Sequence, residues 1–225
     1  MSPNRRVSSM AGSPGGGSAG QKYYGVAVGI VTNNEDPMAM GRVKMSFPWL
    51  SDDHESNWAR VCTPMAGNEW GAQFIPEVED EVLVAFDRGD IRCPYVVGAL
   101  YNGEDKPELT NSNGTNDIRQ IKSRSGHIIK FDDTDGSEKL TIEDKSGNQL
   151  IEFDSAANTV TIKCGGETSF ESTGKFTIKA SEVEIKADTN IKIDAGANLE
   201  AKGSAGVKVE ASGTTTIKGA TVNIN

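Results

Sequence analysis

Residues 170–225 read FESTGKFTIKASEVEIKADTNIKIDAGANLEAKGSAGVKVEASGTTTIKGATVNIN. Apolar or small residues recur in this stretch with five steps of eight residues and one step of seven. These seam positions are Phe170, Ile178, Ile185, Ile193, Ala201, Val209 and Ile217. In most units a second apolar residue lies two positions earlier, which is the period of a β-strand. The pattern predicts strands of about five residues joined by short turns.

Each eight-residue unit, or octad, has too few apolar side chains to build a core alone. A single-chain β-helix needs roughly 18 residues per coil, so one octad is long enough for only one face of a triangular prism. We therefore expect three copies of the chain to wind about one axis as a trimeric intertwined β-helix or β-prism. A disordered tail is the alternative, but disorder does not keep Ile and Val in phase. The expected trimer core contains Phe170, Ile178, Ile185, Ile193, Val209 and Ile217.

Charged residues alternate with the seam positions. They are expected on the outer face of the prism, where opposite charges on neighbouring chains can pair. These residues are Lys179, Glu184, Lys186, Lys192, Glu200, Lys208, Glu210 and Lys218.

The composition favours an all-β protein. The chain has 225 residues, of which 25 are glycine and only 6% are aromatic, as suits many short strands and turns. No window of 18 apolar residues is present, so no membrane span is expected. Residues 1–22 are rich in Gly, Ser and Pro and contain no apolar core of a signal peptide, which predicts a flexible arm and synthesis in the cytoplasm. Three scattered cysteines favour a reducing compartment and argue against a zinc site.

Residues 23–105 are expected to form a small Greek-key barrel. Alternating apolar residues predict successive strands, with one long connection at residues 51–57, and the OB-fold fits this pattern best. Pro48 is expected to end the second strand. The alternating sets are Val26, Val28 and Ile30, then Val43, Met45 and Phe47, then Val82, Val84 and Phe86, with further strands at 58–62 and 93–103.

The charge of the expected barrel argues against nucleic-acid binding. Between residues 23 and 105 there are five basic and fourteen acidic side chains, a net of −9. An OB-fold that binds single strands needs a basic groove with stacking aromatic residues, and an acidic surface repels phosphates. The aromatic residues are therefore expected in the core or in protein contacts.

Five consecutive motifs carry a resemblance to a known family. They are GRVKMSFPW at 41–49, SNWARV at 56–61, AGNEWG at 66–71, FIPEVEDEVLVAF at 74–86 and PYVVGALYNG at 94–103. Together they resemble the spike family of contractile injection systems, which includes phage baseplate spikes, VgrG proteins of type VI secretion and spikes of phage-tail-like particles. The chain is most similar to the short form without a hub domain, because only 22 residues precede the expected barrel.

The resemblance implies a structural role. It implies a homotrimeric needle in a baseplate that pierces a target envelope, with a baseplate hub protein, the inner tube, a PAAR-repeat tip protein and effector cargo as partners. Such a spike acts in a particle that stays inside the cell, is anchored or is released. The alternative is a trimeric receptor-binding tail fibre or adhesin. No enzymatic activity and no cofactor are expected.

Residues 106–120 are expected to be a linker, and residues 121–225 the shaft. The shaft opens with a tandem repeat, in which residues 125–145 are followed by the similar residues 146–165. Each repeat reads as strand, turn, strand, with turns expected at Asp135-Gly136 and Ala157-Asn158.

Two acidic clusters have the residue types of a metal site or a catalytic site. Asp132, Asp133 and Asp135 resemble part of a calcium loop, but the intervening residues do not supply the remaining ligands, so a turn is favoured. Glycoside hydrolysis needs two acids that converge in a cleft. The acids between residues 77 and 81 lie instead on a turn that leads into a strand.

The C-terminal end is expected to be blunt. His127 is the last histidine of the chain, so the histidine-bearing iron motif of some related tips is not present. Exposed apolar ends favour a protein cap, which the resemblance identifies as a PAAR-repeat protein. The expected contact residues for this tip protein are Ile217, Val222, Ile224 and Asn225.

Overall fold

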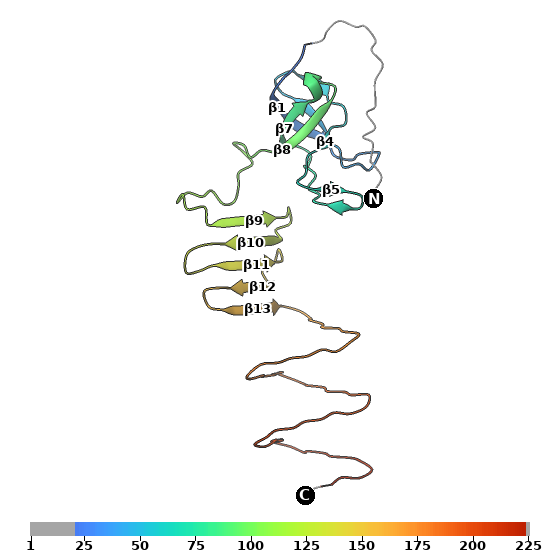
Figure 1. Cartoon of the computed structure of the whole chain (residues 1–225), viewed down its shortest axis with the longest axis vertical. Coiled ribbons are helices and arrows are strands. Elements are labelled where there is room, and N and C mark those ends of the chain that lie inside the picture. The colour runs from blue at the N-terminus through green and yellow to red at the C-terminus, as the bar shows by residue number, and fades with distance from the viewer. Residues whose placement is uncertain (1–20, 224–225) are drawn as a thin grey trace, which may run out of the picture. The chain divides into compact units, whose positions relative to one another are not determined.

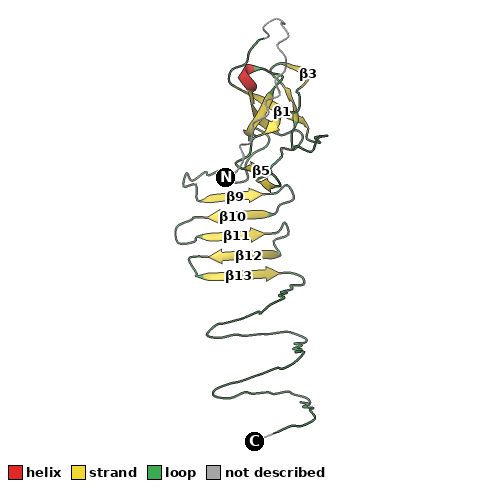
Figure 2. Ribbon diagram, turned by 45° about the vertical axis from the view of Figure 1, so that its right-hand side comes forward, coloured by secondary structure: helices red, strands yellow, loops and turns green. Residues whose placement is uncertain are grey.

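The computed structural model describes residues 21–223, and its regular structure consists of β-strands and one short 3-10 turn (Figures 1 and 2). The predicted all-β fold is therefore confirmed. The chain divides into two units between Gly166 and Glu167, which are described separately. None of the helical structure within residues 21–223 is long and apolar enough to cross a membrane. Residues 1–20 of the expected arm, together with Ile224 and Asn225, lie outside the described residues.

The first sheet forms the predicted barrel. Its strand order is β3-β2-β1-β7-β8-β4, and the neighbours are antiparallel except for the parallel pair β4 and β8. An antiparallel bridge between Val43 and Ala59 joins the residue before β2 to the residue before β4, so the end strand β4 is linked back to the β2 side of the sheet and the barrel closes. The strands are β1 (Val26–Asn33), β2 (Lys44–Phe47), β3 (Ser51–Glu55), β4 (Arg60–Val61), β7 (Glu81–Phe86) and β8 (Pro94–Ala99).

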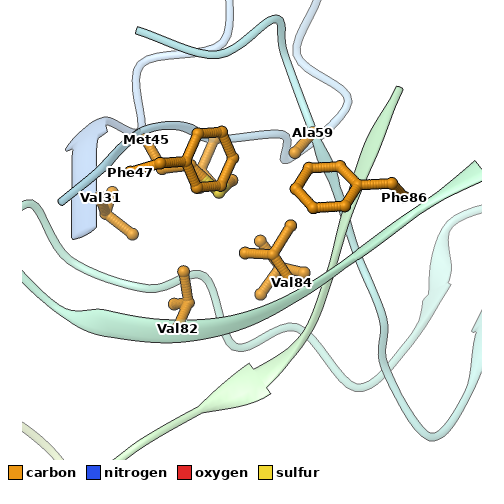
Figure 3. Close-up of a cluster of buried hydrophobic side chains, with 9 residues drawn as sticks. Val31, Met45, Phe47, Ala59, Val82, Val84 and Phe86 are labelled. Carbon is orange, nitrogen blue, oxygen red and sulfur yellow. The ribbon is translucent and has the colours of Figure 1, made fainter. Parts of the chain in front are cut away.

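The barrel core is built from alternate residues of these strands. The predicted inward sets on β2 and β7 are confirmed, because every member is buried, and β2 ends at Phe47 as Pro48 predicted. Figure 3 shows these side chains converging from both strands on one cluster. The buried cluster is Val31, Val43, Met45, Phe47, Ala59, Val82, Val84, Phe86 and Val96.

The expected alternation on β1 is wrong. Val26 and Val28 are exposed, whereas Gly29 and Val31 are buried. The pairing explains this, because Gly29 lies opposite Val82, which faces the core. A Cβ atom at Gly29 would lie 3.1 Å from the sulfur of Met45. The large side chain from β2 fills the interior there, so β1 presents its smaller residues inward.

Three local elements were not expected from the sequence: strand β3, a small hairpin and a 3-10 turn. The expected long connection at 51–57 contains strand β3, which pairs with β2. A small hairpin, β5 (Ala66–Gly67) and β6 (Trp70–Gly71), forms a separate two-stranded sheet. A 3-10 turn, η1 (Asp87–Gly89), follows β7. Pairs this short have no alternating pattern long enough to identify a strand from sequence.

An ion pair organises the loop between β1 and β2. The Asp36 carboxylate accepts hydrogen bonds from Arg42 Nη2 at 2.6 Å and Nε at 2.9 Å. It also accepts from the backbone N–H groups of Met38, Met40 and Arg42. The hydrogen bonds from Arg42 are the main cause that lowers the pKa of Asp36 well below its ordinary value.

A five-stranded antiparallel meander follows the barrel in the chain. Both predicted turns are confirmed, because Asp135-Gly136 lies between β10 and β11 and Ala157-Asn158 between β12 and β13. Gly136 and Asn158 have φ angles of 71° and 54°, the left-handed region that Gly and Asn tolerate best. The strands are β9 (Ile118–Lys122), β10 (Ile128–Asp132), β11 (Lys139–Glu143), β12 (Gln149–Asp154) and β13 (Thr159–Cys164).

The second unit consists of extended segments separated by bends. Within the described residues 167–223 no segment is paired into a strand, and Figure 1 draws this part as a trace without arrows. The five-residue strands expected from the octads are therefore extended in conformation but lack the hydrogen-bonded neighbour that defines a strand. Backbone N–H and C=O groups are strong hydrogen-bonding groups, so these segments are suited to pairing with other chains.

Candidate assembly interface

The bends of the second unit follow the octad period. Each seam position lies three residues before a bend, from Phe170 with its bend at 173 to Ile217 with its bend at 220. The single seven-residue step, between Ile178 and Ile185, is also a seven-residue step between bends. The sequence period is thus a geometric period, because the chain changes direction at the same point in every octad.

The seam positions are open to solvent in the single chain. The six predicted trimer-core residues, Phe170, Ile178, Ile185, Ile193, Val209 and Ile217, are between 62% and 74% exposed. A soluble protein rarely leaves a long row of large apolar side chains uncovered. This row is therefore a candidate interface, although its occupant stays a prediction.

Charged residues occupy the opposite face of the same segments. Three ion pairs join residues two positions apart: Glu184 with Lys186 at 2.8 Å, Lys192 with Asp194 at 3.6 Å, and Lys208 with Glu210 at 2.6 Å. Residues two apart in an extended chain share a face. The alternation of apolar and charged faces predicted from the sequence is therefore present in these octads.

The meander has an apolar face that the sequence analysis did not single out as an interface. Two ladders of paired apolar residues lie on this face, one across all five strands and one across β10 to β13. Most of their members are at least 38% exposed, so no other part of the described chain covers them. The tandem repeat offered a sequence signal for this face, because the apolar residues that match between its two copies are members of these ladders. The ladders are Ile121, Ile129, Ile142, Ile151 and Ile162, and Phe131, Leu140, Phe153 and Val160.

The other face of the meander carries an ion-pair cluster. Lys139 Nζ lies 2.8 Å from Asp154 and 3.3 Å from Glu152, and both carboxylates accept hydrogen bonds that raise the pKa of Lys139. Thr141, on the same strand as Lys139, is buried. This face therefore has polar contacts within the chain, whereas the ladder face is largely exposed.

The barrel carries a cleft of mixed polar and apolar lining beside the β5–β6 hairpin. Its volume is about 570 Å³, and Met40, Met65, Trp70 and Phe74 line it. These four side chains are more than half exposed. Among the aromatic residues of the described barrel, Phe47 and Phe86 are core residues, whereas Trp70 and Phe74 are exposed and available for contacts.

The two acidic clusters have structural partners. The Asp132 carboxylate accepts hydrogen bonds from the backbone and hydroxyl of Thr134, and Asp133 pairs with Arg119. The Asp80 carboxylate accepts a hydrogen bond from the N–H of Glu77, which shapes the turn before β7. Across residues 21–223, no group of three or more His, Cys, Asp or Glu side chains could hold a metal ion.

Two of the four expected tip residues can be placed. Ile217 is 72% exposed and Val222 is 49% exposed, whereas Ile224 and Asn225 lie outside the described residues. The tip contact therefore stays a prediction.

Comparison with known proteins identifies the barrel. Residues 27–101 match the Type VI secretion system/phage-baseplate injector OB domain. The match runs from the second residue of β1 to just beyond the end of β8, so it covers the whole strand set of the barrel. The predicted OB-fold is confirmed.

Relatives extend the similarity beyond the barrel. Type VI secretion system spike protein VgrG1a of Pseudomonas aeruginosa is 29% identical over 213 residues, which cover 72% of this chain and 33% of that protein. VgrG5 of the same species is 36% identical over 118 residues, and VgrG3 of Vibrio cholerae is 32% identical over 123 residues. These two matches cover 49% and 51% of this chain, but only 14% and 12% of the relatives. The chain spans about a third or less of the length of these spike proteins.

Proposed function

The barrel belongs to the injector OB domain family and the chain is related to VgrG spike proteins, and from this premise we propose that it is the structural spike of a contractile injection baseplate. In this proposal three copies form a needle that pierces the target envelope. The proposed action is mechanical. Strands paired across chains would resist axial force, because several hydrogen bonds would have to break together. The predicted resemblance to spike proteins is confirmed. The trimeric state is part of what we propose.

One observation carries the trimer. The seam residues keep their phase with the bends through every octad, yet remain exposed in a single chain. Three octads, one from each chain, would close a triangular cross-section with the seam inside. Burial of apolar surface stabilises such an assembly by roughly 25 cal/mol per Å². The apolar face of the meander supports the same arrangement, because it too lacks a partner within the described chain.

The proposed partners follow from the surfaces. The acidic barrel, with the exposed apolar side chains that line its cleft, is proposed to contact a hub protein and the inner tube. The end near Ile217 and Val222 is proposed to bind a PAAR-repeat tip protein, which would cover the exposed apolar ends and could carry effector cargo. A tail fibre is not favoured, because the related proteins are spike proteins. In this role the chain needs no catalytic residue and no cofactor.

Light scattering on the full chain tests the trimer. A trimer has three times the 24.0 kDa chain mass, about 72 kDa. A species of this mass that persists on dilution supports the proposal, and a monomer at micromolar concentration contradicts it. Co-purification with candidate hub and PAAR-repeat proteins then tests the partners. Loss of PAAR-repeat binding in Val222→Asp, with hub binding kept, would place that contact at the C-terminal end.

A further inference from the structure

We infer that the outer face of the octads carries an alternating charge pattern that sets the register between neighbouring chains. In this register each octad stacks on the following octad of the next chain. The inference rests on the proposed trimer and adds a rule that decides how its three chains are staggered.

Strand β13 defines the frame of the pattern. Thr159–Cys164 reads TVTIKC, with apolar residues at its second and fourth positions and a bend directly after it. Residues 175–180 (KFTIKA) have the same form, and 214–219 (TTTIKG) share its Thr-Ile-Lys core with Thr215 at the second position; both segments precede a bend. β13 is therefore the first member of the octad series, and it is already a hydrogen-bonded strand through β12. Its other edge is open for a strand of the next layer.

The third and fifth positions of this frame lie on the outer face. In the octads that begin at residues 182, 190, 198 and 206, both positions are charged, and the order of signs reverses from each octad to the next. The in-chain ion pairs between third and fifth positions show that these side chains share one face. The third positions are Glu184, Lys192, Glu200 and Lys208, and the fifth are Lys186, Asp194, Lys202 and Glu210.

Three-fold winding decides which octads meet. If each chain moves to the next face at every bend, octad n of one chain lies directly against octad n+1 of its neighbour. Every charge in these four octads then faces an opposite charge in at least one adjacent layer. A two-octad stagger would instead place like charges together at both positions. Like charges directly opposite one another on adjacent strands are destabilising.

The fifth position is charged in every unit from Lys163 to Lys218, so the staggers can be compared along this whole series. With a one-octad stagger only one of its seven steps joins like charges, Lys179 with Lys186, and that step crosses the seven-residue octad. In a single-chain coil octad n would meet octad n+3. Three of the five resulting pairs are then like-charged: Lys163 with Lys186, Glu171 with Asp194, and Lys179 with Lys202. The pattern fits contacts between chains better than contacts within one.

Each exposed pair contributes little stability alone, so the role of the pattern is specificity. The apolar seam is nearly the same in every octad and cannot distinguish one stagger from another. A one-residue slip is excluded by the alternation of faces, but a whole-octad slip preserves it. The charges penalise a slip to a two-octad stagger.

A two-residue swap tests the inference in the full-length chain. The variant Lys192→Asp with Asp194→Lys keeps the composition, the net charge and the pairing within the octad. Both exchanged side chains then face like charges in the layers above and below. We expect the thermal midpoint of the trimer to fall by several degrees in low salt. In about 1 M salt, where the Debye length is ~3 Å, most of this loss should disappear.

The matched control reverses all four octads together. It carries both substitutions of the test variant and swaps the third and fifth positions of the other three octads as well. Alternation is restored, and the single like-charged step moves from Lys179 with Lys186 to the pair formed with Lys218. We expect a midpoint close to that of the native chain. Equal damage in both variants would overturn the inference, as would an undamaged two-residue swap.

Cysteine cross-linking reads the stagger directly. Asn190, Asn198 and Gly206 occupy the first position of consecutive octads, and an added Cβ at Gly206 meets no atom within 4 Å. In a chain whose native cysteines are replaced by serine, Asn190→Cys with Asn198→Cys should give a covalent trimer on oxidation. Adjacent strands lie ~4.8 Å apart, within the Cα reach of a disulfide. Asn190→Cys with Gly206→Cys, about 9.6 Å apart in this register, should not.

The outcomes separate the two levels of the proposal. A monomeric native chain contradicts the proposed spike itself. A native trimer that cross-links only through the 190 and 206 pair contradicts the one-octad register and leaves the trimer standing.

Discussion

The barrel and the octads solve the problem of apolar burial in opposite ways. Met45 and Val84 are fully buried within a single chain, whereas Val209 is 74% exposed in the same chain. The difference lies in chain reversal, since the barrel brings six strands back onto one core while an octad bends before any strand can pair with it. A single chain can therefore bury the barrel core, whereas burial of the octad seam is proposed to come from association.

The largest effect is expected at the seam. Ile193→Asp places three like charges on the axis of a trimer, where burial of an unpaired charge is very costly. We expect complete loss of the trimer in light scattering. The control Lys192→Gln lies on the outer face and should keep it. A trimer that survives Ile193→Asp would show that the seam does not face the axis.

Removal of the octads comes next. A chain that ends at Gly165 should lose any resistance of the assembly to sodium dodecyl sulfate on gels, because the interchain ladders are gone. The barrel transition, followed by tryptophan fluorescence, should remain. If the shortened chain resists the detergent as the full chain does, the barrel and meander hold the trimer without the octads.

A core substitution in the barrel has a smaller and more local effect. Met45→Ala creates a cavity in a fully buried site and should lower the free energy of unfolding of the barrel by about 2–5 kcal/mol. Denaturant titration measures this change, and the mass in native buffer should stay that of the native assembly. Met38→Ala, at an exposed position, is the matched control.

The smallest effect concerns pH. Because the pKa of Asp36 is lowered in the folded barrel, its ion pair with Arg42 stabilises the fold above the ordinary Asp pKa of about 3.9. This contribution is lost as the pH falls through the lowered folded pKa. Asp36→Asn should therefore melt earlier than the native chain at pH 7, and the two midpoints should converge as the medium becomes strongly acidic. Parallel midpoints across the whole range would mean that this carboxylate does not contribute to the acid response.

Sequence patterns predicted the elements whose two faces differ strongly. On β2 the inward residues alternate with polar neighbours, and on β7 every second residue is Val or Phe, so the strands and inward faces were predictable. The turns at Gly136 and Asn158 follow from local backbone preference. On β1 nearly every residue is small or apolar, so the pattern did not reveal which face points inward. The apolar face of the meander was likewise missed as an interface, because only the pairing of β9 to β13 aligns its residues into ladders.

The sequence by itself determined the octad period, the alternation of apolar and charged faces and the family of the barrel, because each of these is encoded in residues close together along the chain. Only the tertiary structure decided how the barrel closes, through the Val43–Ala59 bridge and the parallel pairing of β4 with β8. Those contacts join segments far apart in sequence, and their register depends on which side chains fill the shared interior. The same reason explains Gly29, whose place in the core is set by Met45 on the neighbouring strand.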